Sequence, residues 1–89
     1  MENQGIGWAV KQMHNGAKVR RSGWNGKGMW IGLVPGDQWG LGSGSPFDYG
    51  GEGPGSLLPW IGMKTADHHF VPWLASQTDL LAIDYEIAE

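Results

Sequence analysis

The sequence predicts an α+β fold: an antiparallel sheet of four or five strands, covered by one N-terminal helix and one short C-terminal helix. Three observations predict it. Apolar residues near the start of the chain follow helical spacing, several later runs are rich in strand-forming residues, and a helix-capping pattern lies near the end. With 89 residues, the chain is expected to form a single domain, 1–89, with a modest core.

The first element is expected to be an amphipathic helix over residues 6–15. Asn3 is the expected N-cap, and Gly16 is placed to end the helix. Trp8 lies off the apolar stripe, so it is expected either at the edge of the core or against a ligand. The apolar residues that share one face are Ile6, Ala9, Val10 and Met13, extended by Ala17.

Short strands are expected at residues 18–20 and 29–34, joined through a glycine-rich turn. The second run is apolar on both sides, which indicates a central strand or a strand in an interface. Residues 60–65 and 69–71 are expected to form a hairpin, with Pro72 ending its second strand.

The last two elements lie close together in the sequence. Ser76 and Asp79 have the spacing of a capping box, which predicts a short helix over residues 77–82. Apolar and polar residues then alternate over 83–87, which predicts a final, half-exposed strand.

Residues 36–58 are expected to be a loop insertion rich in glycine and proline. Eight of the sixteen glycines and four of the five prolines lie within 35–59. The segment lacks the strand–turn–helix context of a dinucleotide-binding loop and the Gly-Lys-Ser/Thr sequence of a P-loop. We therefore interpret it as a lid or a linker, not as a phosphate-binding loop.

Composition limits the partners of the protein. A net charge of −3 argues against binding to long nucleic acid. The absence of cysteine rules out disulfides and thiolate metal sites. The sequence contains no long apolar run of the kind that would indicate a membrane anchor. Six tryptophans are many for so small a core, so some are expected to line a ligand pocket or a subunit interface.

Positive charge is concentrated in one part of this acidic chain. Four of the six Lys and Arg residues lie within ten positions of one another, namely Lys18, Arg20, Arg21 and Lys27. The same stretch holds Trp24, Trp30 and several glycines. Guanidinium groups match phosphate oxygens and indoles stack on bases, so a small, flat, anionic ligand such as a nucleotide would suit it. The alternative is a corner between two strands with a buried tryptophan and solvated charges.

A second informative segment covers residues 71–79. It places Trp73 next to the tip of the predicted short helix, where backbone N–H groups attract anions. Ser76, Thr78 and Asp79 add side-chain donors and acceptors. The alternative is that Ser76 and Asp79 only cap the helix while Trp73 packs in the core.

Catalytic chemistry is weakly indicated. His68 and His69 are adjacent in the expected hairpin turn, where they would point to opposite sides and lie at the surface. The carboxylates are scattered, with Asp84 and Glu86 expected on one face of the last strand, and no nucleophile elbow is present. The sequence therefore nominates no catalytic residue, no metal ligand and no cofactor.

Residues 23–29, 63–67 and 71–82 together resemble the second type of phage Thoeris anti-defence protein. The resemblance implies a homotetrameric α+β sponge that sequesters glycocyclic ADP-ribose signals, made by TIR-domain enzymes, without cleaving them. It also implies pockets between subunits and a place of action in the cytoplasm of an infected bacterial host. Some members similarly hold cyclic dinucleotides at a separate site, which would extend the block from Thoeris to CBASS defence.

The resemblance also implies which residues contact the ligand. From the first segment these are Trp24, Asn25, Gly26 and Lys27, and from the last segment Trp73, Ser76, Thr78 and Asp79. We add Trp8, Arg20 and Arg21 on physical grounds, because stacking surfaces and cations suit a nucleotide.

The chain departs from the pattern of the family at several positions. Ala75 stands where proline is expected, and His68 stands where a turn glycine is common. Residues 83–85 replace an acid followed by Asp-Trp, and the glycine-rich loop has no clear counterpart. Two other functions stay open from the residues: an enzyme that cleaves the same nucleotides, and a tryptophan-rich module for protein–protein interaction.

Overall fold

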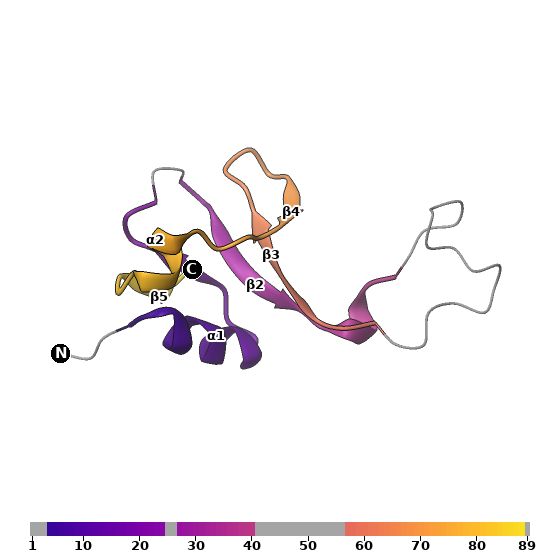
Figure 1. Ribbon diagram of the computed structural model, residues 1–89. Coiled ribbons are helices and arrows are strands. Elements are labelled where there is room, and N and C mark those ends of the chain that lie inside the picture. The colour runs from indigo at the N-terminus through magenta and orange to yellow at the C-terminus, as the bar shows by residue number, and fades with distance from the viewer. Residues whose placement is uncertain (1–3, 25–26, 41–56, 89) are drawn as a thin grey trace.

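The computed structural model describes residues 4–24, 27–40 and 57–88. A five-stranded antiparallel sheet with the order β4-β3-β2-β1-β5 is accompanied by two α-helices (Figure 1). In chain order the elements are α1 (Ile6–His14), β1 (Val19–Arg21), β2 (Trp30–Val34), the 3-10 helix η1 (Gly36–Gln38), β3 (Trp60–Lys64), β4 (Phe70–Pro72), α2 (Gln77–Leu81) and β5 (Tyr85–Ile87). The predicted α+β class is confirmed, and the sheet has the larger of the two expected numbers of strands.

The core lies between α1 and one face of the sheet. Ala9 and Met13 project from α1 and are almost fully buried. They meet Val19, Ile31 and Tyr85, which come from β1, β2 and β5 and are equally inaccessible. Removal of these apolar side chains from water holds the helix against the three strands.

The ends of α1 agree with the prediction at one terminus only. Gly16 follows the helix with a φ of 90°, and its N–H donates to the Met13 carbonyl, so the expected stop is confirmed. At the other terminus Gly5, not Asn3, is the N-cap, and Asn3 itself lies outside the described residues. The chain before Gly5 is extended because Gln4 forms a parallel bridge with Asp84, which leaves no room for an earlier start.

Strand register separates the two faces of the sheet. Val19, Ile31 and Met63 are cross-strand partners, so they share the face that α1 covers. Trp30 points to the other face, where its ring meets the Phe70 ring edge to face at 5.7 Å. β2 lies third in the five-strand order, which confirms that the run with apolar residues on both sides is a central strand.

The β3–β4 hairpin was predicted nearly in place. β4 extends one residue further than expected, because Pro72 pairs with Gly62 as the last residue of the strand. An edge strand accepts proline where no N–H is required. In the turn, His68 adopts a φ of 66°, a left-handed conformation that glycine adopts more readily than other residues.

The two ends of the insertion are tied together where they leave the sheet. Gly36 lies so close to the Leu57 carbonyl that any side chain there would collide with it. The Trp39 indole N–H donates to the Leu58 carbonyl at 2.9 Å, and the ring packs edge to face on Trp60. The short helix η1 is the element that the expected loop contains here, and the rest of the insertion lies outside the described residues.

The C-terminal part is more exposed than the sequence pattern predicted. The capping box of α2 is present, but β5 begins at Tyr85, two residues later than the predicted strand. Tyr85 is buried, whereas Ile83 and Ile87 are 65% and 40% exposed. The alternating pattern therefore identified the inward position correctly and left two apolar side chains in solvent. Within the described ranges, none of the helices is long and apolar enough to cross a membrane.

Candidate functional site

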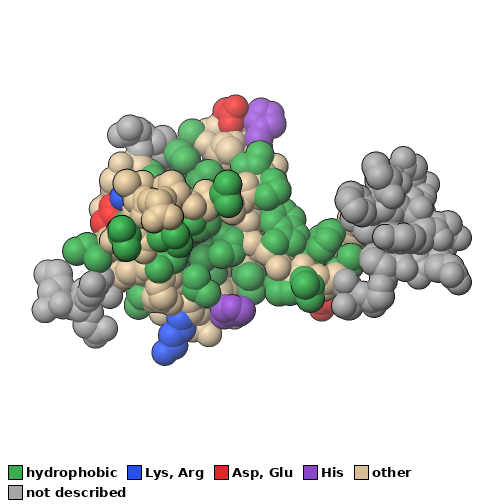
Figure 2. Space-filling model, viewed as in Figure 1, with side chains coloured by type: hydrophobic (Ala, Val, Ile, Leu, Met, Phe, Trp, Pro, Cys, Tyr) green, Lys and Arg blue, Asp and Glu red, His purple; other side chains and the backbone are tan. Residues whose placement is uncertain are grey.

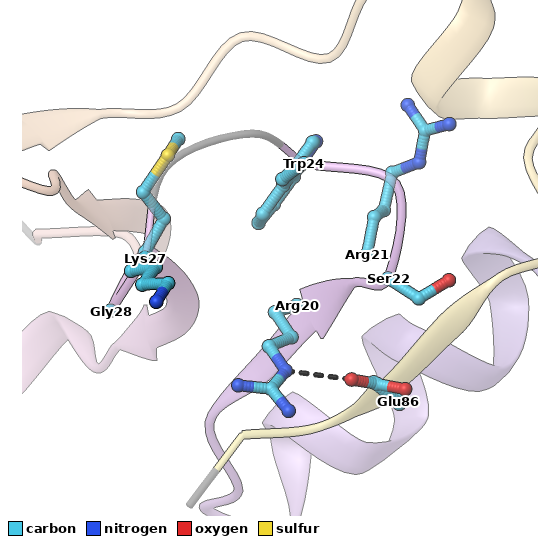
Figure 3. Close-up of a pocket in the computed structure, with 8 residues that line it drawn as sticks. Arg20, Arg21, Ser22, Trp24, Lys27, Gly28 and Glu86 are labelled. Atoms are coloured by element: carbon cyan, nitrogen blue, oxygen red, sulfur yellow. Dashed lines mark hydrogen bonds and ion pairs between the residues drawn. The ribbon is translucent and has the colours of Figure 1, made fainter.

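A pocket of about 390 Å³ opens beside the turn that joins β1 to β2 (Figure 3). Its lining combines three cations, one indole and one carboxylate with small and apolar groups. The residues are Arg20, Arg21, Ser22, Trp24, Lys27, Gly28, Met29 and Glu86. β1 and the following turn supply most of them, and β5 contributes the carboxylate. The cationic stretch of the sequence thus lines a concave surface.

Arg20 forms an exposed ion pair within this lining. Its Nε lies 2.7 Å from a carboxylate oxygen of Glu86, its cross-strand partner on β5, and the two side chains are 44% and 41% exposed. Exposed pairs of this kind contribute at most about 1 kcal/mol, because water competes for both groups. An anionic ligand can therefore take over the Arg20 guanidinium at low cost.

The far end of the turn is fixed by a lysine from β3. Lys64 donates from Nζ to the Gly28 carbonyl at 3.0 Å. Gly28 has a φ of 78°, in the left-handed region that glycine adopts readily. Lys27, next to this anchor, is exposed at the mouth of the pocket. The anchor therefore holds the exposed Lys27 ammonium close to the pocket.

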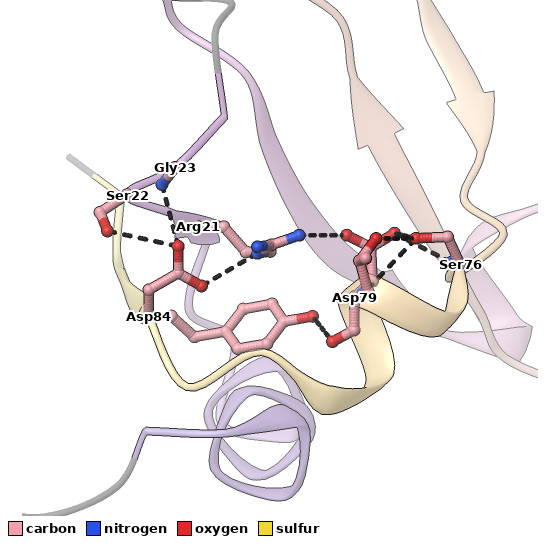
Figure 4. Close-up of polar contacts among 8 residues, drawn as sticks. Arg21, Ser22, Gly23, Ser76, Asp79 and Asp84 are labelled. Carbon is pink, nitrogen blue, oxygen red and sulfur yellow. Dashed lines mark hydrogen bonds and ion pairs between the residues drawn. The ribbon is translucent and has the colours of Figure 1, made fainter.

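Arg21 behaves differently from its neighbour. Its guanidinium turns toward α2 and lies 2.9 Å from Asp84 and 2.8 Å from Asp79 (Figure 4). Hydrogen bonds from Arg21 hold the pKa of Asp84 below its usual value, and the two carboxylates raise the pKa of Arg21. Burial alone would raise the pKa of Asp79, but hydrogen bonds from the Ser76 backbone and from Arg21 outweigh it and lower that pKa. All three groups are therefore charged at neutral pH.

Asp84 also organises the turn that carries Trp24. Its carboxylate accepts a hydrogen bond from the Gly23 N–H at 3.0 Å and a longer one from the Ser22 hydroxyl at 3.4 Å. The Trp24 N–H donates to the Arg21 carbonyl at 3.1 Å and closes the turn. A Cβ at Gly23 would lie 3.0 Å from the Asp84 carboxylate, so the close approach depends on glycine.

Asp79 completes the network on the side of α2. Its carboxylate accepts from the Ser76 N–H at 2.9 Å, and its own N–H donates to the Ser76 hydroxyl at 3.2 Å. The Tyr85 hydroxyl donates to the Asp79 carbonyl at 2.6 Å. The cap occupies the Asp79 N–H at the helix tip, so this N–H is not a free donor. Thr78 is exposed and shares a hydrogen bond with Ser76.

The two segments nominated by the sequence meet through their indoles. The rings of Trp24 and Trp73 pack edge to face, with centroids 6.3 Å apart. Both side chains are half-buried and lie against the edge of the core. Each thus combines an exposed part with a fixed position, which a stacking surface requires.

The predicted site residues divide into three groups. Arg20, Arg21, Trp24 and Lys27 line the pocket, and contacts with Trp24 and Arg21 connect Trp73, Asp79, Ser76 and Thr78 to it. Trp8 packs against the core from α1 and is not in the described lining. Asn25 and Gly26 lie outside the described residues.

Sequence reasoning missed the two carboxylates that face the arginines. Asp84 and Glu86 were noted, but they were expected on one face of a strand without partners. In the structure Arg21 binds one and Arg20 the other. Two adjacent arginines and two alternating acids were a usable signal. It becomes specific only once β5 is known to pair with β1.

The described residues offer no site for a metal ion. No group of three or more His, Cys, Asp or Glu side chains gathers within these ranges. His68 and His69 are exposed in the hairpin turn, which confirms their expected surface position.

Comparison with known proteins places the chain in a family. Residues 4–88 match the family model named Tad2-like, the Thoeris anti-defense 2-like domain. The chain belongs to this family. The chain is also 39% identical over 86 residues to a protein of Bacillus phage SP01 named Thoeris anti-defense 2, covering 92% of this chain and 91% of the phage protein. Membership in the Thoeris anti-defense 2-like family implies a role against Thoeris defence.

Proposed function

We propose that the protein binds glycocyclic ADP-ribose signals and holds them without cleavage, so that they cannot activate Thoeris defence. The pocket at the β1–β2 turn is the observation that carries the proposal, because it places cations beside an indole. A cyclic ADP-ribose derivative carries a pyrophosphate and an adenine, which need such groups. Membership in the Thoeris anti-defense 2-like family supports the same conclusion.

The size and lining of the pocket suit this ligand class. A volume of about 390 Å³ falls within the range of small-molecule sites. Stacking of a base on an indole contributes ~1–3 kcal/mol, and each hydrogen bond from a cation to a phosphate contributes ~1.5–3 kcal/mol. A few such contacts offset the cost of association and reach nanomolar affinity. Tight capture therefore needs no covalent step.

The state of Asp79 and Asp84, the two carboxylates that Arg21 binds, favours capture over cleavage. Asp79 and Asp84 have lowered pKa values because Arg21 and backbone N–H groups bind them. A general acid needs a raised pKa, and a general base needs an unoccupied oxygen close to the reacting proton. Neither carboxylate meets these requirements.

The proposal includes assembly into a homotetramer in the cytoplasm of the infected host, where the signals form. The surface around α2 and the segment before it supports assembly, because it leaves large apolar side chains in solvent (Figure 2). Leu74, Leu81 and Ile83 are 91%, 78% and 65% exposed. Exposed apolar groups this numerous are typical of an interface. Light scattering of the purified protein is expected to give the mass of four chains, and a monomer would contradict this part of the proposal.

Incubation with glycocyclic ADP-ribose, followed by heat denaturation and chromatography of the released material, tests the central claim. Intact ligand in a stoichiometric amount supports sequestration. A converted product would instead identify an enzyme acting on the same signals. If neither glycocyclic ADP-ribose nor a cyclic dinucleotide shifts the melting temperature, the tryptophan-rich surface serves protein–protein interaction. The cyclic dinucleotide also tests whether the ligand range extends to CBASS signals.

A further inference from the structure

We infer that Arg21 is a positioning residue, which joins the two indole-bearing segments through Asp84 and Asp79 and does not bind the phosphates itself. The contact with anions then falls to Arg20 and Lys27. This inference rests on the proposed function, because it assigns roles within the same pocket. It also makes Asp79 a positioning residue and not the ligand contact that the resemblance implies.

A continuous chain of hydrogen bonds carries the inference. Asp84 binds the Gly23 N–H in the turn before Trp24, and Arg21 binds Asp84. Arg21 also binds Asp79, which forms the cap of α2 with Ser76. The chain thus runs from the turn of one indole to the helix that follows the other. Figure 4 shows it as one connected row of contacts.

Charge separates the two arginines. The Arg21 guanidinium lies between two carboxylates, so the cluster carries one net negative charge and repels an anion. Removing either carboxylate contact to bind a phosphate would leave a half-buried charge without its partner, which is costly. Among the described residues Arg20 has one carboxylate partner, Glu86, in an exposed pair that exchanges easily.

Side-chain direction leads to the same assignment. Arg20 and Arg21 are consecutive on β1, so their side chains leave opposite faces of the sheet. Figure 3 shows the Arg20 guanidinium beside Glu86 and the Arg21 guanidinium turned away toward a helix. The stem of Arg21 contributes to the lining, while its charged end is committed elsewhere.

Calorimetry with glycocyclic ADP-ribose tests the assignment through two matched variants, each of which removes the charge of one carboxylate that an arginine binds. Asp84→Asn frees part of Arg21, and Glu86→Gln frees Arg20. A positioning role predicts that Asp84→Asn weakens binding at least about tenfold, whereas Glu86→Gln, which removes the carboxylate that competes with the ligand for Arg20, tightens it about two- to fivefold. Arg21→Lys is expected to weaken binding as Asp84→Asn does, because lysine lacks the planar guanidinium that places separate nitrogens on Asp84 and Asp79. The double variant Arg21→Lys/Asp84→Asn is expected to be no weaker than either single variant.

A second measurement needs no ligand. In protein labelled with 5-fluorotryptophan, the fluorine resonances of Trp24 and Trp73 are assigned by single Trp→Phe variants. Asp84→Asn is expected to shift both resonances, and Glu86→Gln neither. Met13→Val is the control, because it lowers stability from the core without touching this chain of hydrogen bonds. It is expected to change neither the positions of the two resonances nor the affinity.

Either of two results would overturn the inference. One is equal or tighter binding by Asp84→Asn while Arg21→Lys binds weakly, which would make Arg21 a direct phosphate ligand. The other is an unchanged position of both resonances in Asp84→Asn. If the unmodified protein fails to bind glycocyclic ADP-ribose, the proposed function fails, and the fluorine spectra still decide the positioning role.

Discussion

Trp24 and Trp73 meet edge to face at 6.3 Å, with an angle of 67° between their ring planes. The two residues are far apart in sequence and belong to different loops. Their contact is therefore a product of the fold, and it joins the two segments that the sequence nominated for ligand binding. We therefore expect the ligand affinity of this site to fall when either ring is removed.

Replacement of either indole is expected to weaken capture of glycocyclic ADP-ribose. Trp24→Ala or Trp73→Ala removes a stacking surface worth ~1–3 kcal/mol, which corresponds to about 5- to 150-fold in affinity. Calorimetry measures the loss, and circular dichroism confirms that each variant is folded. Trp39→Ala, at the base of the insertion, is the control and is expected to bind as the unmodified protein does. Normal binding by either site variant would remove that residue from the site.

Lys27→Gln is expected to reduce affinity and to flatten its dependence on salt concentration. The exposed ammonium at the pocket mouth attracts an anion through solvent, and salt screens that attraction. The measurement is calorimetry at two ionic strengths, about 0.05 and 0.3 M. Lys11→Gln removes the same charge from the exposed side of α1 and is expected to change neither quantity. Equal effects of the two variants would show that only net charge matters.

Two glycine replacements are expected to change stability in opposite directions. Gly28→Ala forces alanine into a left-handed conformation at 78°, with Lys64 in the way, and is expected to cost about 1–2 kcal/mol. Gly7→Ala lies in α1 with open space around it and is expected to stabilise by about 0.5–1 kcal/mol. Urea denaturation gives both free energies of unfolding. An unchanged free energy of unfolding in Gly28→Ala would show that the turn is not held as described.

Acid is expected to destabilise the protein through the Arg21 network. Hydrogen bonds from Arg21 lower the pKa of Asp84 in the folded state, so its stabilising contribution is complete above the unfolded pKa of about 3.9. This contribution is lost as pH falls through the folded value below that. Melting curves from pH 6 to about pH 2.5 are therefore expected to show a smaller acid-induced loss for Asp84→Asn. Met13→Val keeps the carboxylates and is expected to retain the full loss.

Local sequence patterns predicted the elements of this fold well. Helical spacing marked α1, the capping pattern marked α2, and turn residues marked the β3–β4 hairpin. Boundaries failed where distant segments decide them. Gln4 is held extended by Asp84, and Pro72 is included in β4 by Gly62, and neither pairing is visible in a local window.

The sequence predicted which types of residue form the candidate site better than it predicted the role of each residue. The residue types near Arg20 and Trp24 indicated an anion with a flat ring, and the structure gathers most of them around one pocket. The pairing of β1 with β5 was not predictable from spacing, and it decides which arginine is neutralised. Asp84 was missed for the same reason, because a carboxylate acquires its role from its partner.

The contacts among Gly36, Trp39, Leu57 and Leu58 have a consequence for the length of the insertion. These contacts hold the two ends of the glycine-rich insertion together beside the sheet. The pairing of β2 with β3 therefore does not depend on the number of residues between those ends. The entropy of closing a loop grows only slowly with its length. The pairing of β2 with β3 is therefore expected to tolerate a change in the number of residues between positions 40 and 57, which a variant with a lengthened insertion tests by its melting temperature.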